Sequence, residues 1–393
     1  MNTTTQSLPP PSPIGREFSS FIKDSIELLR RMVAVPSVTF EEKAVRDLVG
    51  THLKQWGISF CYERNNILAL NRHARPERPT LMLCAHLDTV APSSGYSRNP
   101  YDPGTDDDRI WGLGSNDDGG SVVAMIAAFR HYYDSTALPF NLLLALSCEE
   151  ERSGPNGTAH LWTGNTLSRA LNAGLANEGK TQQNTDDWTP RFAIIGEPTG
   201  GRAATSERGL LVIDGEVHGQ SGHAARNEGV NALYIALDDI QRLRNFDFDR
   251  VSPLMGRVKL SVTQIEAGTA HNVIPDTCRF VVDIRPTEQY SNAEILKLLQ
   301  RECHSTLTAR NLRNRSNATR SGSPLLAALD HLGIETFSSP TTSDWVRTPC
   351  DAIKFGPGES SRSHRPDEFI LIQEIEQAIT HYIAFIENVN IME

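Results

Sequence analysis

The spacing of apolar residues predicts two helices near the start of the chain. Between Phe18 and Met32 apolar residues recur every three or four positions, which is typical of a helix that buries one face. A similar pattern runs from Val45 to Trp56 and stops at Gly57, a residue that commonly terminates helices.

Short apolar runs then alternate with helical patterns. The runs that predict strands are Ile67–Leu70, Thr80–Ala85, Phe140–Ser147 and Phe192–Ile195, and the helical patterns between them are Ser121–Tyr133 and Gly157–Ala176. Strands that alternate with helices favour a largely parallel sheet covered by helices on both faces. The sequence therefore predicts an α/β fold.

The pattern changes from about Thr205, where strands and helices follow in the order β-α-β-β-α-β. The expected elements are Leu210–His218, Val230–Leu243, Val258–Glu266, Cys278–Ile284, Asn292–Arg301 and Ser305–Ala309. This order predicts an α+β, ferredoxin-like unit, and the polar run Arg310–Ser323 is expected to leave it.

After that run the first pattern returns, so we expect the small unit to be inserted into the large one. A helix is expected at Leu325–Leu332, a strand at Ala352–Phe355 and a long helix at Leu371–Glu387. The expected division is a mobile arm over residues 1–16, a catalytic domain formed by residues 17–204 and 316–393, and the inserted domain over residues 205–315.

Composition excludes several classes of partner. The 393 residues include 38 basic and 48 acidic side chains, and the net charge of −10 argues against nucleic acid and anionic membranes as partners. No apolar run approaches the roughly 18 residues that cross a bilayer. Six cysteines without a CxxC pair favour reduced thiols, and the first residues lack the basic start and apolar centre of a secretory signal. We therefore expect a cytoplasmic protein.

Polar residues directly after apolar strands are the candidates for chemistry, because ligands bind beyond the carboxyl ends of parallel strands. Taken alone, each has an ordinary explanation as a structural histidine, a helix cap or a solvated charge. Together they offer the nitrogen and oxygen ligands that Zn²⁺, Co²⁺ or Mn²⁺ accept, and they predict a two-metal hydrolase with one further carboxylate as proton carrier. The candidates are His86 with Asp88, Asp117 with Asp118, Glu149–Glu151, Glu197 and His364.

Two other classes of function stay open at this point. The acidic clusters could hold calcium in a protein without catalytic activity, although calcium prefers six to eight oxygen ligands and little histidine. Alternatively Cys84 or Cys148 could be a nucleophile, but both lie in apolar strand segments that disfavour a thiolate.

Seven motifs resemble those of the M20 metallopeptidase family, in the family's order and over about residues 20–390. The resemblance implies a zinc-hydrolase-type catalytic domain with an inserted lid and dimerisation domain. It also implies an enzyme that removes the acyl group from an N-acyl amino acid, and it is greatest to the deacetylases of arginine biosynthesis that act on N-acetylornithine or N-acetylcitrulline. A desuccinylase, dipeptidase or carboxypeptidase is the alternative. The motifs are LCAHLDTV, GLGSNDDGG, EEERSGPNG, IGEPTG, SGHAARNEG, HNVIPD and SRSHRPDE.

The resemblance also implies a role for each candidate residue. Two divalent cations are expected, zinc first and cobalt or manganese as alternatives, one held by His86, Asp117 and Glu197 and the other by Asp117, Glu151 and His364. Asp88 would orient His86, and Glu150 would be the general base. A shift of one residue would instead make Glu149 the base and Glu150 the ligand. Gly119 departs from the family pattern, where many members carry lysine.

In the inserted domain the resemblance implies contacts across a homodimer. His223 would reach the neighbouring subunit's site and stabilise the oxyanion, and Asn272 and Arg285 would contact a small N-acyl amino acid substrate. From the residues alone, Arg285 could equally form an ion pair with Asp283 or Glu288.

Overall fold

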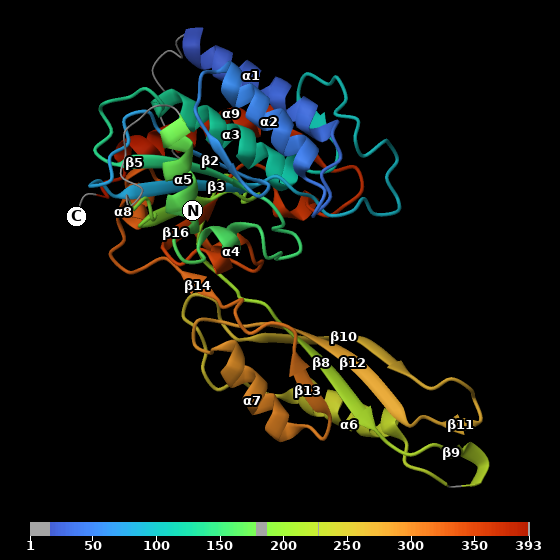
Figure 1. Ribbon diagram of the computed structural model, residues 1–393. Coiled ribbons are helices and arrows are strands. Elements are labelled where there is room, and N and C mark those ends of the chain that lie inside the picture. The colour runs from blue at the N-terminus through green and yellow to red at the C-terminus, as the bar shows by residue number, and fades with distance from the viewer. Residues whose placement is uncertain (1–15, 178–186, 227, 392–393) are drawn as a thin grey trace, which may run out of the picture.

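The computed structural model describes residues 16–177, 187–226 and 228–391. They form a large α/β unit and a smaller α+β unit that projects from it (Figure 1). The arm expected over residues 1–16 falls, except for Arg16, outside the described residues. The helices are α1 (Arg16–Val33), α2 (Lys43–Gln55), α3 (Gly120–Tyr132), α4 (Thr158–Leu161), α5 (Thr166–Asn177), α6 (Ala232–Asn245), α7 (Asn292–Glu302), α8 (Pro324–His331) and α9 (Ile372–Asn388).

The large unit is built on a mixed sheet with the order β1-β2-β5-β3-β6-β16-β7-β14, in which β15 also pairs with β7. The central strands β5, β3, β6 and β16 are mutually parallel, as predicted, while β2 and β7 run antiparallel at the two flanks. The strands are β1 (Cys61–Glu63), β2 (Asn66–Leu70), β3 (Thr80–His86), β5 (Asn141–Ser147), β6 (Phe192–Ile195), β7 (Ala203–Glu207), β14 (Asn317–Ala318), β15 (Thr336–Ser339) and β16 (Asp351–Phe355).

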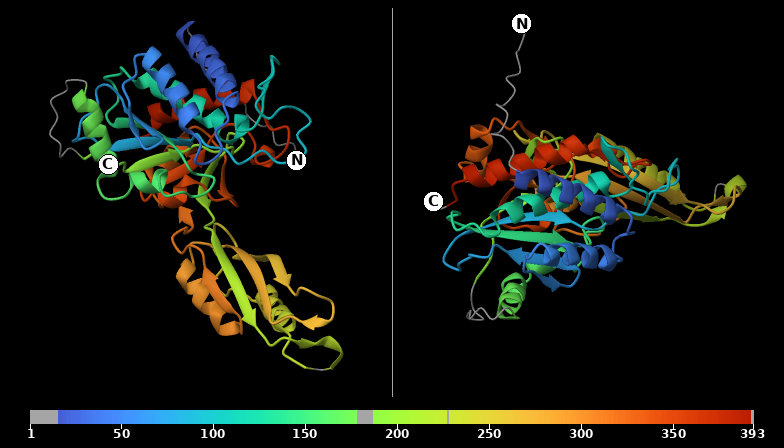
Figure 2. Two further views of the ribbon diagram at one scale, coloured as in Figure 1. Left: turned by 45° about the vertical axis from the view of Figure 1, so that its right-hand side comes forward. Right: turned by 90° about the horizontal axis from the view of Figure 1, so that it is seen from above.

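Side chains of the central strands alternate between two apolar cores. Leu81 and Leu83 of β3 pack with α1, α2, α3 and α9 on one face, whereas Met82 and Cys84 face the core under α4 and α5. Every residue of β3 and of β5 is buried, as expected for parallel strands covered on both faces. Figure 2 shows helices on the two sides of this sheet.

The small unit has the predicted β-α-β-β-α-β order. Its strands form an antiparallel sheet in the order β10-β12-β8-β13, the arrangement of a ferredoxin-like unit, and α6 and α7 pack against it around an apolar core of its own. The short strands β9 and β11 pair at the far end of this unit (Figure 1). The strands are β8 (Leu211–His218), β9 (Gly222–His223), β10 (Lys259–Ala267), β11 (Val273–Ile274), β12 (Thr277–Arg285) and β13 (Thr306–Ala309).

Two sequence expectations about elements are wrong. The helix expected over Gly157–Ala176 is two helices, because the chain turns at Gly164 with a φ of 56°. The expected linker Arg310–Ser323 contains β14, which pairs with the end of β7. The division into domains stays a prediction, and β7 continues the large sheet as far as Glu207.

A small two-stranded pairing outside the main sheets was not expected. Strand β4 (Arg109–Trp111) pairs antiparallel with β17 (Phe369–Leu371). The amide of Gly112 also donates to the carbonyl of Glu368 at 2.8 Å. This pairing brings the loop that carries His364 beside the loop that carries Asp117.

Candidate active site

Three central strands end at the same edge of the sheet and carry candidate residues there. His86 is the last residue of β3 and lies in register with Ser147, the last residue of β5. The glutamates at 149–151 follow Ser147 directly, and Glu197 comes two residues after the end of β6. Because these strands are parallel neighbours, their ends place the side chains around one point.

Four of the predicted ligands meet at this edge. Ligand atoms of His86, Asp117 and Glu151 all lie within 4.8 Å of one another. His86 Nε2 is 3.2 Å from Asp117 Oδ1, and His364 Nε2 is 2.9 Å from Glu151 Oε1 and 3.6 Å from Asp117 Oδ2. Asp117 therefore lies between the two histidines, as a bridging ligand would.

Glu197 lies near this group, and its carboxylate forms no hydrogen bond with it among the described residues. Burial raises the pKa of Glu197 well above its ordinary value, an effect that the positive charge of Lys354 opposes and the negative charge of Asp117 reinforces. The side chain is therefore close enough to Asp117 and His86 for their charges to interact. A further cation near Glu197 would offset its desolvation.

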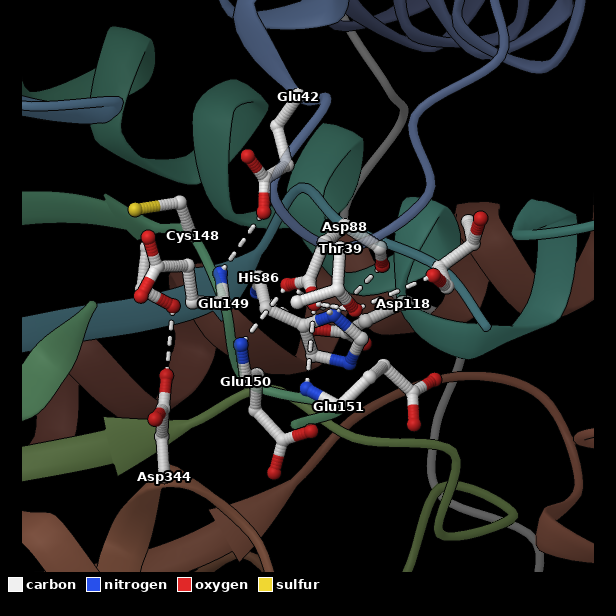
Figure 3. Close-up of polar contacts among 12 residues, drawn as sticks. Thr39, Glu42, His86, Asp88, Asp118, Cys148, Glu149, Glu150, Glu151 and Asp344 are labelled. Carbon is white, nitrogen blue, oxygen red and sulfur yellow. Dashed lines mark hydrogen bonds and ion pairs between the residues drawn. The ribbon is translucent and has the colours of Figure 1, made fainter. Parts of the chain in front are cut away.

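Asp88 connects His86 to both candidate glutamates (Figure 3). The His86 Nδ1 lies 2.9 Å from the main-chain carbonyl of Asp88 and 3.5 Å from its Oδ1, so Nδ1 carries a proton and Nε2 faces Asp117. The Asp88 carboxylate accepts hydrogen bonds from the amides of Glu150 and Glu151, at 3.0 and 3.2 Å, and from Thr39 Oγ1 at 2.8 Å. Asp88 thus holds the main chain of the glutamate pair as well as the imidazole.

The glutamates at 149 and 150 have different surroundings. The Glu149 carboxylate accepts from the main-chain amide of Asn156 at 2.9 Å and from its side-chain Nδ2 at 2.8 Å. The Glu150 carboxylate has no such partner among the described residues, and burial raises its pKa well above the ordinary value. Glu149 is therefore engaged in the turn that follows it, while Glu150 is available for proton transfer.

The electrostatics of the cluster favour a bound cation. Burial alone would lower the pKa of His86, but hydrogen bonds with Asp117 and Asp88 outweigh it and raise that pKa well above the ordinary value. The hydrogen bond with Glu151 raises the pKa of His364 to about 9. The Nε2 atom of each histidine therefore faces a carboxylate oxygen, and either a proton or a metal cation between the two atoms would satisfy the pair.

Asp118 adds a buried polar atom without a partner. Its Oδ1 accepts no hydrogen bond from the described residues, and Oδ2 accepts only weakly from the amide of His86 at 3.3 Å. Burial raises the pKa of Asp118 to about 7. The nitrogen and oxygen donors, without a thiolate among them, fit a catalytic site for divalent metals better than a structural zinc site.

Sequence reasoning missed two buried acids that shape the site. Glu368 Oε1 accepts from the amides of Asn116 and Asp117, both at 2.9 Å, and burial raises its pKa to about 8. Glu42 Oε1 accepts from the amide of Glu149 at 3.2 Å. Neither residue follows a predicted strand. Glu368 is, however, the last residue of the motif SRSHRPDE that contains His364, and this closeness in sequence could have indicated a place near the site.

Asp344 anchors the site from a distant segment of the chain. Its Oδ2 accepts from Ser147 Oγ at 2.6 Å and from Thr158 Oγ1 at 2.7 Å. The short helix η3 (Asp344–Arg347) is thereby fixed against the end of β5. Burial raises the pKa of Asp344 above its ordinary value.

Gly119 departs from the family pattern for a steric reason. A Cβ atom built there would lie 2.4 Å from the Gly114 carbonyl oxygen and 2.5 Å from Leu29 Cδ1. Helix α1 therefore packs too closely over this loop for a side chain.

Three predicted residues lie in the small unit. His223 in β9 is exposed and pairs with Val273, and the Asn272 carbonyl accepts from the amide of Ala224 at 3.1 Å. Strands β9 and β11 lie at the end of the small unit that is remote from the large unit (Figure 1). Arg285 forms a two-point ion pair with Asp283, at 2.8 and 3.0 Å, the alternative that the sequence had left open.

The two cysteines considered as nucleophiles are buried. Burial raises the pKa of the Cys84 thiol well above its ordinary value and also raises that of Cys148. Neither offers the thiolate that nucleophilic catalysis needs.

No helix in the described ranges has the length and apolar character needed to span a membrane.

An α/β sheet whose strand ends gather histidines and carboxylates in this way fits the class of metal-dependent hydrolases. A family model described as Peptidase family M20/M25/M40 matches residues 82–388, and the chain belongs to this family. The expected resemblance, fold and enzyme class are thereby confirmed.

Relatives and solved structures agree with this assignment. Succinyl-diaminopimelate desuccinylase of Cereibacter sphaeroides is 26% identical over 395 residues, which cover 93% of this chain and 98% of that protein. Acetylornithine deacetylase of Proteus mirabilis is 25% identical over 401 residues, covering 92% and 96%. The crystal structure of an M20 family metallo-carboxypeptidase from Sulfolobus solfataricus matches with a TM-score of 0.68 at 17% identity, over 95% of this chain and 99% of that one.

Proposed function

We propose that the protein hydrolyses the amide bond of an N-acyl amino acid and releases a carboxylate and a free amine. An acetyl group on ornithine or citrulline is the substrate we favour. The observation that carries the proposal is the meeting of His86, Asp117, Glu151 and His364 beside the unpartnered carboxylate of Glu150. A named deacetylase among the relatives supports the choice of acyl group.

Two divalent cations would be held at the strand ends, zinc first and cobalt or manganese as alternatives. One would bind His86, Asp117 and Glu197, the other Asp117, Glu151 and His364. When bound, such a pair polarises the scissile carbonyl and makes water more acidic. The position of Asp117 between the two histidines supports its role as the shared ligand.

Glu150 would carry the proton in both directions. As general base it removes a proton from the water that attacks the acyl carbon, and as general acid it returns that proton to the leaving amine. Its amide is held by Asp88 at 3.0 Å, which fixes the main chain but leaves the carboxylate free. The hydrogen bonds from Asn156 to Glu149 support this register over the alternative in which Glu149 is the base.

The small unit would act as a lid and as the contact between two subunits. His223 would enter the neighbouring subunit's site and stabilise the oxyanion, with Asn272 beside it contacting substrate. Their exposure at the tip of the unit, and the exposed apolar side chains Tyr234 and Leu237 on α6, support a homodimer. Arg285 would reach the substrate only by giving up its ion pair with Asp283.

Substitution of Glu150 by glutamine tests the proposal most simply. We expect zinc content to persist and turnover of N-acetylornithine to fall about 10³-fold, the scale of general base catalysis. The matched control is Glu149→Gln, which neutralises the neighbouring carboxylate and should keep turnover within a few-fold. A Glu150→Gln enzyme with near-native turnover, or loss of turnover only in Glu149→Gln, would contradict the assigned base.

The second candidate function is desuccinylation at the same site, favoured by the desuccinylase among the relatives. A dipeptidase or carboxypeptidase would also use this arrangement. We propose a comparison of kcat/KM for N-acetylornithine, N-acetylcitrulline, N-succinyl amino acids and dipeptides. The acetyl compounds should give the largest values, and a preference for succinyl compounds or dipeptides would replace the deacetylase proposal.

A further inference from the structure

Arg347 lies near Glu150, the candidate base, and has no role in the mechanism described so far. Arg347 ends the short helix η3, whose first residue, Asp344, is held by hydrogen bonds to the hydroxyls of Ser147 and Thr158. Ser147 is the last residue of β5, three positions before Glu150. The Arg347 guanidinium is close enough to Asp344 and Glu150 for their charges to interact.

The guanidinium of Arg347 is unpaired within the part of the chain that the structure describes. Its Nε is buried without a hydrogen-bond partner, and no residue in the described ranges forms a hydrogen bond or ion pair with the rest of the group. A buried donor without a partner is unfavourable, because it has lost its hydrogen bonds to water. An arrangement of this kind therefore favours a ligand that supplies the missing acceptor.

A second positive charge lies close enough to Arg347 for the two charges to interact. The exposed Arg313, in the segment that returns from the small unit, interacts unfavourably with Arg347, and burial together with this charge lowers the pKa of Arg347. The Arg313 side chain also forms no hydrogen bond or ion pair among the residues described. Two guanidinium groups that form no ion pair with the described residues attract an anion, although Asp344 and Glu150 already offset part of the charge of Arg347.

Arg285 differs from this pair. Its Nε and Nη2 already bind the two oxygens of Asp283, so the planar fork of the group is occupied. Arg347 and Arg313 are therefore better placed to receive a carboxylate without first breaking an ion pair.

We propose that Arg347, assisted by Arg313, binds a carboxylate of the substrate and selects acyl amino acids that carry one. This inference rests on the proposed function and deepens it, because the carboxylate would lie a few bonds from the amide that is cleaved. Two parts of such a substrate could supply it: the α-carboxylate of the amino acid or the terminal carboxylate of a dicarboxylic acyl group. The bound group is the same in both, and substrates with one carboxylate neutralised distinguish them.

The experiment compares each substrate with its carboxamide in the zinc-loaded enzyme. One arm uses N-acetylornithine and its α-carboxamide, and the other uses an N-succinyl amino acid and the analogue with a terminal carboxamide. The variants are Arg347→Gln and Arg313→Gln, with Arg315→Gln as the matched control because this exposed arginine lies in the same segment. Circular dichroism and thermal unfolding establish that each variant is folded.

We expect Arg347→Gln to lower kcat/KM about 100-fold for the carboxylate substrate and only about two-fold for its carboxamide, as for a lost hydrogen bond between charged groups. Arg313→Gln should show a smaller loss with the same selectivity, and Arg315→Gln none. The arm in which selectivity is lost identifies the carboxylate that is bound. If the α-carboxylate arm responds, the amino acid is recognised, and if the succinyl arm responds, the acyl group is recognised.

If Arg347→Gln lowers kcat/KM equally for the carboxylate substrate and its carboxamide, Arg347 acts on Glu150 or Asp344 and the inference is overturned. A variant that keeps the wild-type preference for the carboxylate substrate would also overturn it. If the wild-type enzyme hydrolyses none of these amides, the proposed function is refuted, and the inference about Arg347 is then tested without turnover. In that case calorimetric binding of N-acetylornithine and its carboxamide to wild-type and Arg347→Gln protein decides the inference. Weaker binding of the carboxylate compound alone supports it, and equal binding overturns it.

Discussion

Replacing Asp88 by asparagine removes one hydrogen-bond acceptor at the centre of the site. Asp88 is 1% exposed, and its two oxygens accept from three donors: Thr39 Oγ1 and the amides of Glu150 and Glu151. Oδ1 receives the amide of Glu150, and Oδ2 receives the other two. An asparagine side chain has one acceptor oxygen and one NH₂ group, so at least one of these donors must face another donor.

The cost follows from that mismatch. A hydrogen bond to a charged group contributes about 1.5–3 kcal/mol. If the asparagine oxygen keeps the two partners of Oδ2, the amide of Glu150 loses its acceptor and meets an NH₂ group. We therefore expect the free energy of unfolding to fall by about 2–4 kcal/mol. The turn that carries Glu150 should shift, and kcat should fall by about 10²-fold, because small displacements of catalytic groups have effects of this size.

Thermal unfolding, zinc content and kcat together test this reasoning. Zinc should still bind, because the proposed ligands are unchanged. The control is Thr39→Val, which removes the hydrogen bond from Thr39 Oγ1 to the carboxylate, worth about 1.5–3 kcal/mol, but leaves both amides bound to Asp88, so that the turn carrying Glu150 should not shift. Wild-type stability and wild-type kcat in Asp88→Asn would refute the positioning role of Asp88.

Two further predictions concern the buried acids. Glu368→Ala leaves the amides of Asn116 and Asp117 without an acceptor and should lower the free energy of unfolding by about 2–6 kcal/mol. Glu368→Gln keeps the acceptor oxygen and should lower it much less. Thermal unfolding at pH 7 compares the two variants, and equal losses of stability would contradict the assignment. The buried Glu207 has a pKa raised from 4.5 to about 6, so the folded protein binds the extra proton and loses about 2 kcal/mol of stability as the pH rises through that range. In Glu207→Gln this loss should disappear from unfolding curves measured between pH 4.5 and 6.5, and an unchanged pH dependence would show that Glu207 does not titrate in this range.

The sequence predicted the central strands and the residues that follow them because both depend on local patterns. An apolar run followed by His86, or by the glutamates at 149–151, marks a strand end at the edge of a parallel sheet. The order of the strands then brings these ends together, as the register of β3 with β5 confirms. The inserted unit was predictable for a similar reason, because its strands and helices follow regular apolar periods.

The parts that were missed depend on contacts between distant segments. Strands β4 and β17 have three residues each and no alternating pattern, yet their pairing brings the His364 loop to Asp117. Glu368 and Asp344 become important only because they meet the amides of Asn116 and Asp117 and the hydroxyls of Ser147 and Thr158. No spacing in the sequence reveals such bonds.

Crystallographic anomalous scattering at the zinc absorption edge tests the central claim most directly. Crystals of the zinc-loaded protein should show two peaks about 3.5–4 Å apart at the ends of β3, β5 and β6. Asp117 should lie between them, with His86 and Glu197 on one peak and Glu151 and His364 on the other. Peaks bound elsewhere, or an arrangement in which these side chains do not contact the metals, would contradict the account.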